Sequence, residues 1–294
     1  MAKNTIICSG CSFTWGQGLW YYLDTGEFVP HNEDYIWDVH PIPENGEILR
    51  EKTRWPRIVA EYFNLKEIVK PFNGGTDGES IEFVDYLLDE DKKDFYTRHF
   101  GNVKTNVKEC KWIIFQTTQA FRTPFDFSLN DNEYRLRSAP NLKNLSVLEL
   151  KLKDSHEYYP YKTLNTFTPF YDWLFENNYK IEDFEEIHKK YVIDRIENLL
   201  KKYDEQGINI AIWSWTDEYI EQFKERKFIT DRFINFEYNG TLYDCVETMQ
   251  LRNENLTIKY DPLTLHNTGE DYHPSREGHQ VIARNVIEHI RNYG

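Results

Sequence analysis

Residues 5–18 read TIICSGCSFTWGQG, and this stretch decides the fold class. Residues 5–8 predict a short buried strand, because β-branched residues dominate a brief apolar run. The chain then passes through Gly10 to Ser12, and a glycine returns at Gly16. Glycine lets the backbone turn sharply and approach other groups closely. We therefore expect Ser12 just past the carboxyl end of the first strand, where it is either a nucleophile or a structural turn residue.

Strands and helices alternate along the rest of the chain. Apolar runs predict strands at 67–69, 111–117 and 208–215, and helical spacing of apolar residues predicts helices at 54–64, after the loop 73–80, at 183–203 and after the capping residue Ser275. Strands that are apolar on both faces indicate a parallel sheet covered by helices on both sides. We expect residues 1–294 to form one α/β domain with insertions at about 19–53 and 120–182.

Three loops are expected to meet at one edge of this sheet. In open α/β sheets, ligands bind at the carboxyl ends of the strands. The loops 9–18, 73–80 and 117–123 each follow a predicted strand. Their convergence predicts a functional site at that edge.

Charge and hydropathy exclude several classes of function. The 294 residues include 35 Lys+Arg and 49 Asp+Glu, a formal net charge of -14, which repels phosphate backbones. We therefore expect no nucleic-acid partner. No run of eighteen apolar residues predicts a membrane span. The N-terminus MAKNTIIC has an apolar run too short for a signal peptide, so we expect no export by that route, which leaves a cytoplasmic location open.

Cysteines and aromatic residues each leave two interpretations open. Cys8 and Cys11 form a C-x-x-C, which indicates either redox or zinc chemistry or small thiols buried at a strand end. Aromatic residues make up 16% of the chain and gather in both insertions. These rings either pack the insertions onto the domain or line a groove for a sugar or another flat group.

The end of the chain supplies partners for Ser12. Asp271 and His273 lie two residues apart in DYHPSREGH, so in an extended segment both side chains point the same way. A serine nucleophile needs a base to take its proton and an anion to orient that base. His279 is a second candidate base, although its place in the first turn of a helix also suits packing or capping. Oxyanion donors are expected from the N–H groups of Ser12 and Gly78 and the side-chain amide of Gln119.

These blocks resemble those of the SGNH hydrolase superfamily, the GDSL-type esterases and lipases. GCSFTWG is similar to G-D-S-x-x-x-G, NGGTDGES to the second block, and DYHPSREGHQVIA to the final block with its acid and base. The resemblance implies Ser12 as nucleophile, Gly78 as oxyanion glycine, and Asp271 and His273 as acid and base. It also implies a flavodoxin-like three-layer α/β/α sandwich with about five parallel strands. Two departures occur: Cys11 replaces the family's aspartate, and Gln119 in TTQA replaces the asparagine of the missing G-x-N-D block.

The function implied by the resemblance is that of a serine esterase acting by acyl transfer on a small-molecule or carbohydrate ester. The aromatic insertions favour a carbohydrate O-deacetylase, and Arg122 is expected either to bind an acidic substrate group or to form a surface salt bridge. No metal or cofactor is expected. The sequence does not indicate the oligomeric state.

Two other classes of function remain open. One is a weakened or inactive binding or structural protein with the same fold, as among phage-encoded and virion-associated relatives. The other is a metal-dependent hydrolase, for which the ligand-type residues are Asp261, His266, Asp271, His273 and His279. Phosphate binding by NGGTDGES is disfavoured, because no Lys-Ser/Thr pair follows.

Overall fold

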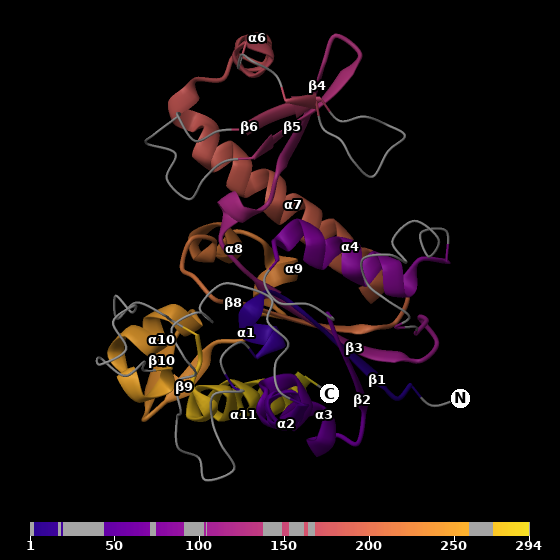
Figure 1. The fold of residues 1–294 in the computed structure, drawn as a ribbon, viewed down its shortest axis with the longest axis vertical. Coiled ribbons are helices and arrows are strands. Elements are labelled where there is room, and N and C mark those ends of the chain that lie inside the picture. The colour runs from indigo at the N-terminus through magenta and orange to yellow at the C-terminus, as the bar shows by residue number, and fades with distance from the viewer. Residues whose placement is uncertain are drawn as a thin grey trace.

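The computed structural model describes residues 3–16, 19, 44–70, 75–90, 103, 105–137, 149–152, 162–163, 168–258 and 273–293 (Figure 1). Asp261, His266 and Asp271 lie outside the described residues, as does the aromatic group expected at 20–37.

Four parallel strands form the central sheet, in the order β2-β1-β3-β8 (Figure 1). Their bounds are Thr5–Ser9 for β1, Lys66–Val69 for β2, Cys110–Thr117 for β3 and Asn209–Ser214 for β8. A parallel bridge between Ile212 and Phe233 extends the sheet beyond β8. Strands that lie inside a parallel sheet are covered on both faces, which explains why they are apolar throughout.

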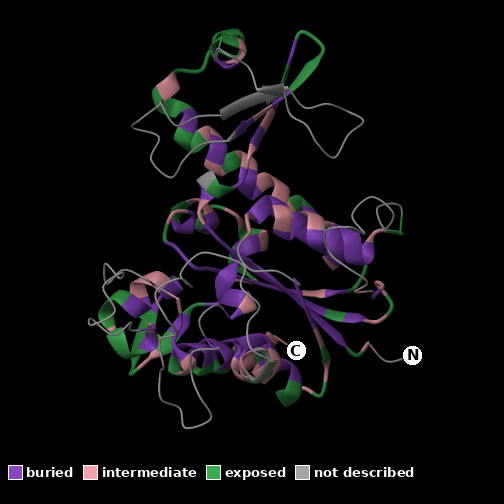
Figure 2. Cartoon of the chain, viewed as in Figure 1, coloured by how far each residue is buried: buried purple, intermediate pink, exposed green. Residues whose placement is uncertain are grey.

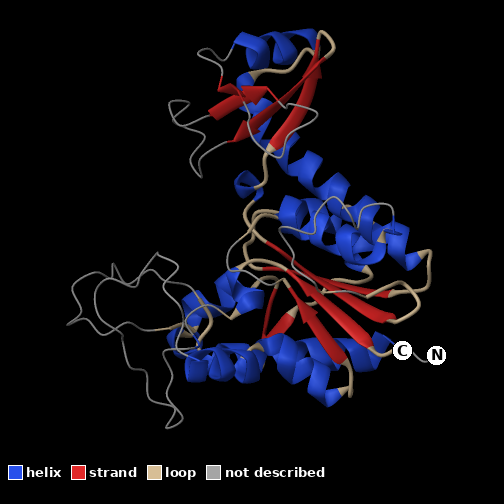
Figure 3. Ribbon diagram, turned by 45° about the vertical axis from the view of Figure 1, so that its right-hand side comes forward, coloured by secondary structure: helices blue, strands red, loops and turns tan. Residues whose placement is uncertain are grey.

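Helices cover both faces of the sheet, so the predicted three-layer α/β/α class is confirmed (Figure 3). Successive strand residues point to opposite faces, and Ile7 joins one hydrophobic core while Ile6 and Cys8 join the other. The first core lies under α4 (Asp77–Leu88), α7 (Phe184–Asp204), α8 (Ile220–Lys224) and α9 (Lys227–Thr230). The second lies under α3 (Trp55–Tyr62), α10 (Val246–Arg252) and α11 (Arg276–Tyr293). Figure 2 shows the resulting buried sheet.

The helix boundaries follow signals in the sequence. Thr76 and Glu79 form a capping box at the start of α4, with the Glu79 N–H donating to Thr76 Oγ1 at 3.0 Å. Ser275 caps α11 as predicted, because its Oγ accepts the Gly278 N–H at 3.1 Å. Each cap satisfies N–H groups that a helix start leaves without a helical partner.

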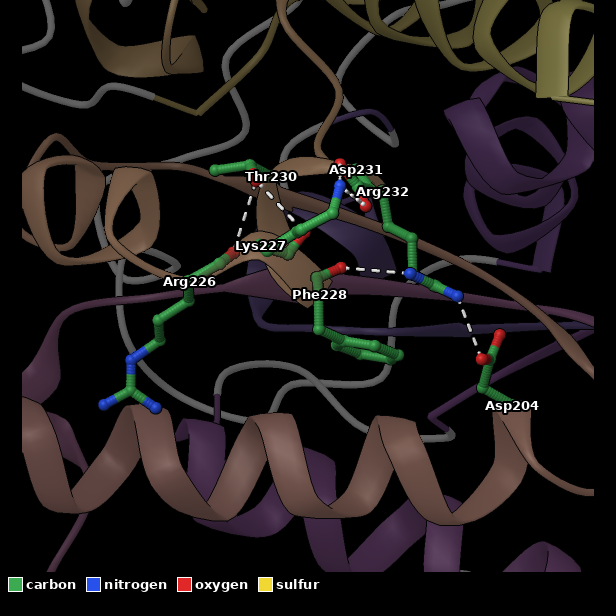
Figure 4. A network of polar contacts seen from close by, with 7 residues as sticks. All are labelled: Asp204, Arg226, Lys227, Phe228, Thr230, Asp231 and Arg232. Carbon is green, nitrogen blue, oxygen red and sulfur yellow. Dashed lines mark hydrogen bonds and ion pairs between the residues drawn. The ribbon is translucent and has the colours of Figure 1, made fainter.

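Ion pairs fasten α9 to α7 beside the β8 edge of the sheet. The Arg226 guanidinium lies 2.7 Å from Asp194 and 2.7 Å from Glu197, both on α7. Arg232 donates to the Phe228 carbonyl at 3.2 Å and to Asp204 at 2.9 Å (Figure 4). These contacts hold residues 226–232 against α7, directly before Phe233, which forms the parallel bridge to Ile212 of β8.

A short hairpin and several single turns complete the described part of the parallel-sheet region. The hairpin pairs β9 (Phe236–Tyr238) with β10 (Thr241–Tyr243), and the turns are α1 (Ser12–Trp15), η3 (Ala120–Arg122) and η6 (Glu254–Leu256). A further turn, η5 (Ile181–Asp183), precedes α7 and packs through Ile181 against the third core described below. Of the expected insertion at 19–53, the structure describes α2 (Glu44–Thr53), which contacts α3 and α11.

The insertion expected at 120–182 contains a second, antiparallel sheet that stands apart from the parallel one (Figures 1 and 3). Its strands, in order, are β4 (Phe125–Leu129), β5 (Asn132–Arg137), β6 (Glu149–Leu152) and β7 (Lys162–Thr163). Asn130 and Asp131 both have positive φ angles, as a two-residue turn between antiparallel strands requires.

A third hydrophobic core joins this antiparallel sheet to α6 (Thr168–Glu176) and to the first turns of α7. Phe170 is fully buried there and Trp173 packs against the same core, which supports the packing interpretation for these two rings. Tyr171 and Phe175 remain exposed. Tyr191 on α7 packs against both the first and the third core, so α7 connects the two sheets.

Candidate functional site

The candidate site is built around Ser12, the first residue of α1, which follows the end of β1. The Oγ of Ser12 lies 2.7 Å from Nε2 of His273, within hydrogen-bonding distance. These two residues are 261 positions apart in the chain. The structure therefore brings together the nucleophile and the base that the sequence predicts, at the carboxyl edge of the parallel sheet.

Backbone contacts hold the segment that carries His273. Its carbonyl accepts the Ile258 N–H at 2.9 Å, and the Ser275 N–H donates to the Leu256 carbonyl at 2.8 Å. Thr257 and Pro274 form an antiparallel bridge between the same two segments. The histidine is thus placed by paired backbone immediately before α11. Asp271, the predicted acid, lies outside the described residues.

Gln116, which was not predicted as a site residue, supports the loop that carries Ser12. This side chain, fully buried near the end of β3, accepts a hydrogen bond from Thr14 Oγ1 at 2.6 Å and donates to Cys11 Sγ at 3.0 Å. Gln116 therefore bridges residues on both sides of Ser12. The only available signal was a polar residue at the end of the apolar run KWIIFQT.

His279 is a capping residue in this structure. Its Nδ1 accepts the Trp55 N–H at 3.2 Å, at the first turn of α3. Burial lowers the pKa of His279 to about 3, and the neighbouring His273 and Arg54 act in the same direction. A neutral imidazole that accepts a backbone N–H has its basic nitrogen occupied, so of the two candidate bases His273 is the one in contact with Ser12.

Two of the residues predicted to supply oxyanion donors, Gly78 and Gln119, form other hydrogen bonds. The Gly78 N–H donates to Oγ1 of Thr123 at 3.2 Å. The side chain of Gln119 is partly exposed, and its Oε1 accepts a hydrogen bond from Arg122 Nε at 3.2 Å. Among the described residues, no hydrogen bond joins Gly78 or Gln119 to Ser12 or His273. The structure thus places Gly78 in the first turn of α4 and Gln119 in the loop after β3, without joining either to the Ser12–His273 pair.

A buried carboxyl group ties these loops together. Asp77 precedes Gly78, and its two oxygens accept the Thr118 N–H and the Tyr219 hydroxyl, each at 2.9 Å. Burial raises the pKa of Asp77 to about 7, although both hydrogen bonds lower it. Three connections, after β2, β3 and β8, therefore meet at one carboxyl group. Sequence reasoning missed this residue because its partners follow strands that are distant in the chain.

Lys70 lies under the glycine-rich loop. This almost fully buried amino group lies 3.7 Å from Glu79, and a β-carbon on Gly75 would collide with it. Burial lowers the pKa of Lys70, whereas Glu79 and the neighbouring Cys11 raise it. Gly75 has a φ of +119°, so the loop needs glycine both for its backbone angle and for this close approach.

Aromatic rings form one side of the site. The ring of Phe13 stacks on His273 at a centroid distance of 5.0 Å and contacts Trp215 at 4.4 Å. The guanidinium of Arg122 lies 5.4 Å from the centroid of the Trp215 ring. These ring contacts therefore connect His273, through Phe13 and Trp215, to the exposed guanidinium of Arg122.

The alternative chemistries gain no geometric support from the residues described. All four cysteines are free and buried, as the small-thiol interpretation of Cys8 and Cys11 expects. Among the described residues, no group of three or more His, Cys, Asp or Glu side chains is arranged to hold a metal ion. Asp261, His266 and Asp271, three of the five residues proposed as metal ligands, lie outside them. Within the same described ranges, no helix is long and apolar enough to cross a membrane.

Comparison with protein-family models, with curated proteins and with solved structures gave no match for this chain. The function of the site is therefore inferred from its own residues.

Proposed function

We propose that this chain is a serine esterase of the SGNH type, acting by acyl transfer through Ser12. The observation that carries the proposal is the 2.7 Å distance between Ser12 Oγ and His273 Nε2. A hydroxyl becomes a useful nucleophile when a positioned base accepts its proton. The order of the blocks along the chain, with the serine first and the histidine last, agrees with the resemblance to that superfamily.

The reaction follows from the two side chains. His273 Nε2 takes the proton of Ser12 as Oγ bonds to the ester carbonyl carbon. The tetrahedral intermediate then collapses, the ester C–O bond breaks, and the leaving alcohol takes the proton from His273. A water molecule, deprotonated by His273, attacks the acyl-serine, and the acid is released as Ser12 regains its proton. Asp271 is proposed to orient His273 and to stabilise its charged form.

The developing oxyanion needs hydrogen-bond donors, and one proposed donor, the Gly78 N–H, is bonded to Thr123 in the ground state. We assign the N–H groups of Ser12 and Gly78 and the side-chain amide of Gln119 to this role. For Gly78 to contribute, its N–H has to exchange Thr123 Oγ1 for the substrate oxygen. Loss of one such donor costs about 100- to 1000-fold in rate, so this exchange would limit the activity.

The substrate we propose is a small-molecule or carbohydrate ester, with O-deacetylation of a carbohydrate as the preferred reaction. The exposed rings of Tyr171 and Phe175 on α6 support a role in contacting flat apolar faces. Those rings belong to the insertion that contains the third core, whereas the proposed acyl transfer takes place at the edge of the parallel sheet.

A second candidate function is a binding or structural protein that keeps the fold with little or no chemistry. Two observations favour it: Ser12 is only 4% exposed, and the Gly78 N–H is already bonded to Thr123. Both would hinder an ester from reaching the nucleophile and the oxyanion donors.

Labelling with a fluorophosphonate probe, followed by intact-mass measurement, separates the two functions. The esterase predicts one adduct on the native protein and none on Ser12→Ala. Ser128→Ala, which changes an exposed serine on β4, is the matched control and should label like the native protein. His273→Gln should slow labelling by a factor on the order of 1000 or more. A folded native protein that acquires no adduct would favour the binding protein.

A further inference from the structure

An exposed guanidinium is held beside the proposed active site by two contacts. Arg122 is the last residue of η3, the turn that follows β3. Its Nε donates to Gln119 Oε1 at 3.2 Å, and its guanidinium lies over the Trp215 ring at 5.4 Å. The turn itself is anchored, because the Ala120 N–H donates to Glu218 Oε2 at 2.9 Å. The cation is therefore pre-positioned although it is exposed to solvent.

The Trp215 ring connects this cation to the reacting pair. Trp215 contacts Phe13, and Phe13 stacks on His273, whose Nε2 lies 2.7 Å from Ser12 Oγ. The charge of Arg122 also lowers the pKa of the buried carboxyl of Asp77, which places Arg122 on the same edge of the sheet. A substrate bound at Ser12 would thus extend toward a cation.

The geometry of Arg122 leaves one edge available for an anion. Because Nε is bonded to Gln119, the two terminal nitrogens form the open edge of the guanidinium. Among the described residues, Arg122 forms no ion pair, whereas Arg54 and Arg226 are held by carboxylates at 2.7 Å. Glu218, which anchors the turn, accepts the Ala120 N–H and forms no ion pair with Arg122 among the described residues. A planar guanidinium edge suits two parallel hydrogen bonds to a carboxylate.

We propose that Arg122 binds a carboxylate carried by the ester substrate, and so makes this site selective for anionic esters. This inference rests on the proposed esterase function and names the substrate class of that same site. The alternative expected from the sequence, a surface salt bridge of Arg122, finds no partner among the described residues.

The net charge of -14 does not oppose this selectivity at short range. At physiological ionic strength the Debye length is about 8 Å, so most surface carboxylates are screened from a bound substrate. A paired guanidinium and carboxylate in contact are screened much less. The overall charge would slow the encounter with an anion, while Arg122 would retain it once bound.

The test compares esters that differ only in a carboxylate and its neutral amide. One pair, 4-nitrophenyl hydrogen adipate and 4-nitrophenyl adipamate, carries the difference on the acyl side. The other pair, 4-acetoxybenzoate and 4-acetoxybenzamide, carries it on the alcohol side. The values of kcat/KM are measured for the native protein and for Arg122→Met, Arg122→Lys and Arg252→Met, with Ser12→Ala as the background. Arg252, an exposed arginine at the end of α10 whose guanidinium lies 6.0 Å from the centroid of the Tyr243 ring, is the matched control.

In at least one pair, we expect kcat/KM of the native protein to be about tenfold higher for the ester that carries the carboxylate than for the one that carries the amide. Arg122→Met should abolish that preference mainly through KM, as loss of a binding contact does. Arg122→Lys should retain part of the preference, because lysine keeps the positive charge but lacks the paired N–H groups of the guanidinium. Arg252→Met should keep the native preference.

Two results would overturn the inference, and they are distinguishable. If Ser12 is labelled and both esters of each pair react equally, or if Arg122→Met keeps the native preference, the esterase stands and Arg122 has no such role. If the folded native protein neither labels nor hydrolyses any of the four esters, the proposed function fails and the inference fails with it.

Discussion

The side chain of Gln116 occupies the space in which residue 10 would carry a β-carbon. Such a carbon would lie 2.8 Å from Cβ of Gln116, 2.5 Å from Thr14 Oγ1, and closer still to Gln116 Oε1. Gln116 and the serine loop therefore fit together because residue 10 is glycine. The requirement arises from crowding rather than from backbone angle, since Gly10 is not among the residues with positive φ.

Gly10→Ala is expected to destabilise the protein by about 1–3 kcal/mol, because the added carbon overpacks a filled site. Urea unfolding at pH 7 measures the change. Gly240→Ala is the control: a β-carbon there meets no atom within 4 Å, although the φ of +75° adds backbone strain. A smaller loss of stability for Gly10→Ala than for Gly240→Ala would contradict the crowding argument.

Gln116→Met is expected to slow fluorophosphonate labelling of Ser12 by about tenfold and to lower stability by about 1–3 kcal/mol. The reason is that buried Thr14 Oγ1 and Cys11 Sγ both lose their polar partner. The labelling rate is read by intact mass over time, and stability by urea unfolding. Labelling at the native rate in a destabilised variant would show that Gln116 supports the fold without positioning Ser12.

His279→Gln is expected to reduce the loss of stability as pH falls from about 6.5 toward 3. The folded pKa of His279 is about 3, below the value of 6.5 for an unfolded histidine, so only the unfolded chain takes up this proton in that window. Stability therefore decreases with falling pH by up to about 1.4 kcal/mol per pH unit for one proton. Glutamine keeps an acceptor for the Trp55 N–H and does not titrate. Urea unfolding from pH 4 to pH 7 measures the slope.

The control for that change is His289→Gln. His289 is half-buried, and burial alone lowers its pKa, so its removal should change the slope less. Equal slopes for native protein and His279→Gln would refute the protonation argument.

The native protein is expected to lose stability as pH rises from about 4 to 7, because of Asp77. Asp77→Asn is expected to remove that loss. The folded pKa of Asp77 is about 7 against 3.8 in the unfolded chain, so the folded state holds the extra proton in that window. Asparagine can accept the Thr118 N–H and donate to the Tyr219 hydroxyl oxygen. Unfolding at pH 5 and pH 8 measures the difference, which should favour the variant more at pH 8. A constant difference would show that Asp77 is ionised throughout.

Arg226→Ala is expected to lower stability by about 1 kcal/mol, because the guanidinium holds two carboxylates of α7 in a partly buried network. High salt should weaken the native network and shrink the difference. The matched control is the adjacent Lys227→Ala, which breaks an exposed pair with Asp231 (Figure 4). Its effect should stay below about 0.5 kcal/mol. Equal urea midpoints for both variants would contradict a specific role for Arg226.

Local patterns in the sequence predicted the fold class well. The apolar runs predicted at 111–117 and 208–215 correspond to β3 and β8, and the helix predicted at 183–203 corresponds to α7. The antiparallel sheet of the second insertion was not predicted. Within it, β4 alternates buried residues with more exposed ones, and so lacks the continuous apolar run that marks the strands of the parallel sheet.

The candidate site was predictable only in part. Ser12 and His273 were identified from residue type and block order, and the structure places them in contact. The roles of Gln116, Asp77 and Thr123 were not identified, since each depends on a partner in another loop or strand.

The alternation of strands and helices can be predicted from local sequence, because burial imposes a period on residues close together in the chain. Residue type also identifies the side chains that have the chemistry of a nucleophile and a base. The folded arrangement is needed to see that residues 261 positions apart meet at 2.7 Å and that Gln116 lies beside Gly10. Such contacts depend on the order and register of β1 and β3, which pair Ser9 with Phe115. Strand order and register are set by the packing of the whole sheet, so no local stretch of sequence encodes them.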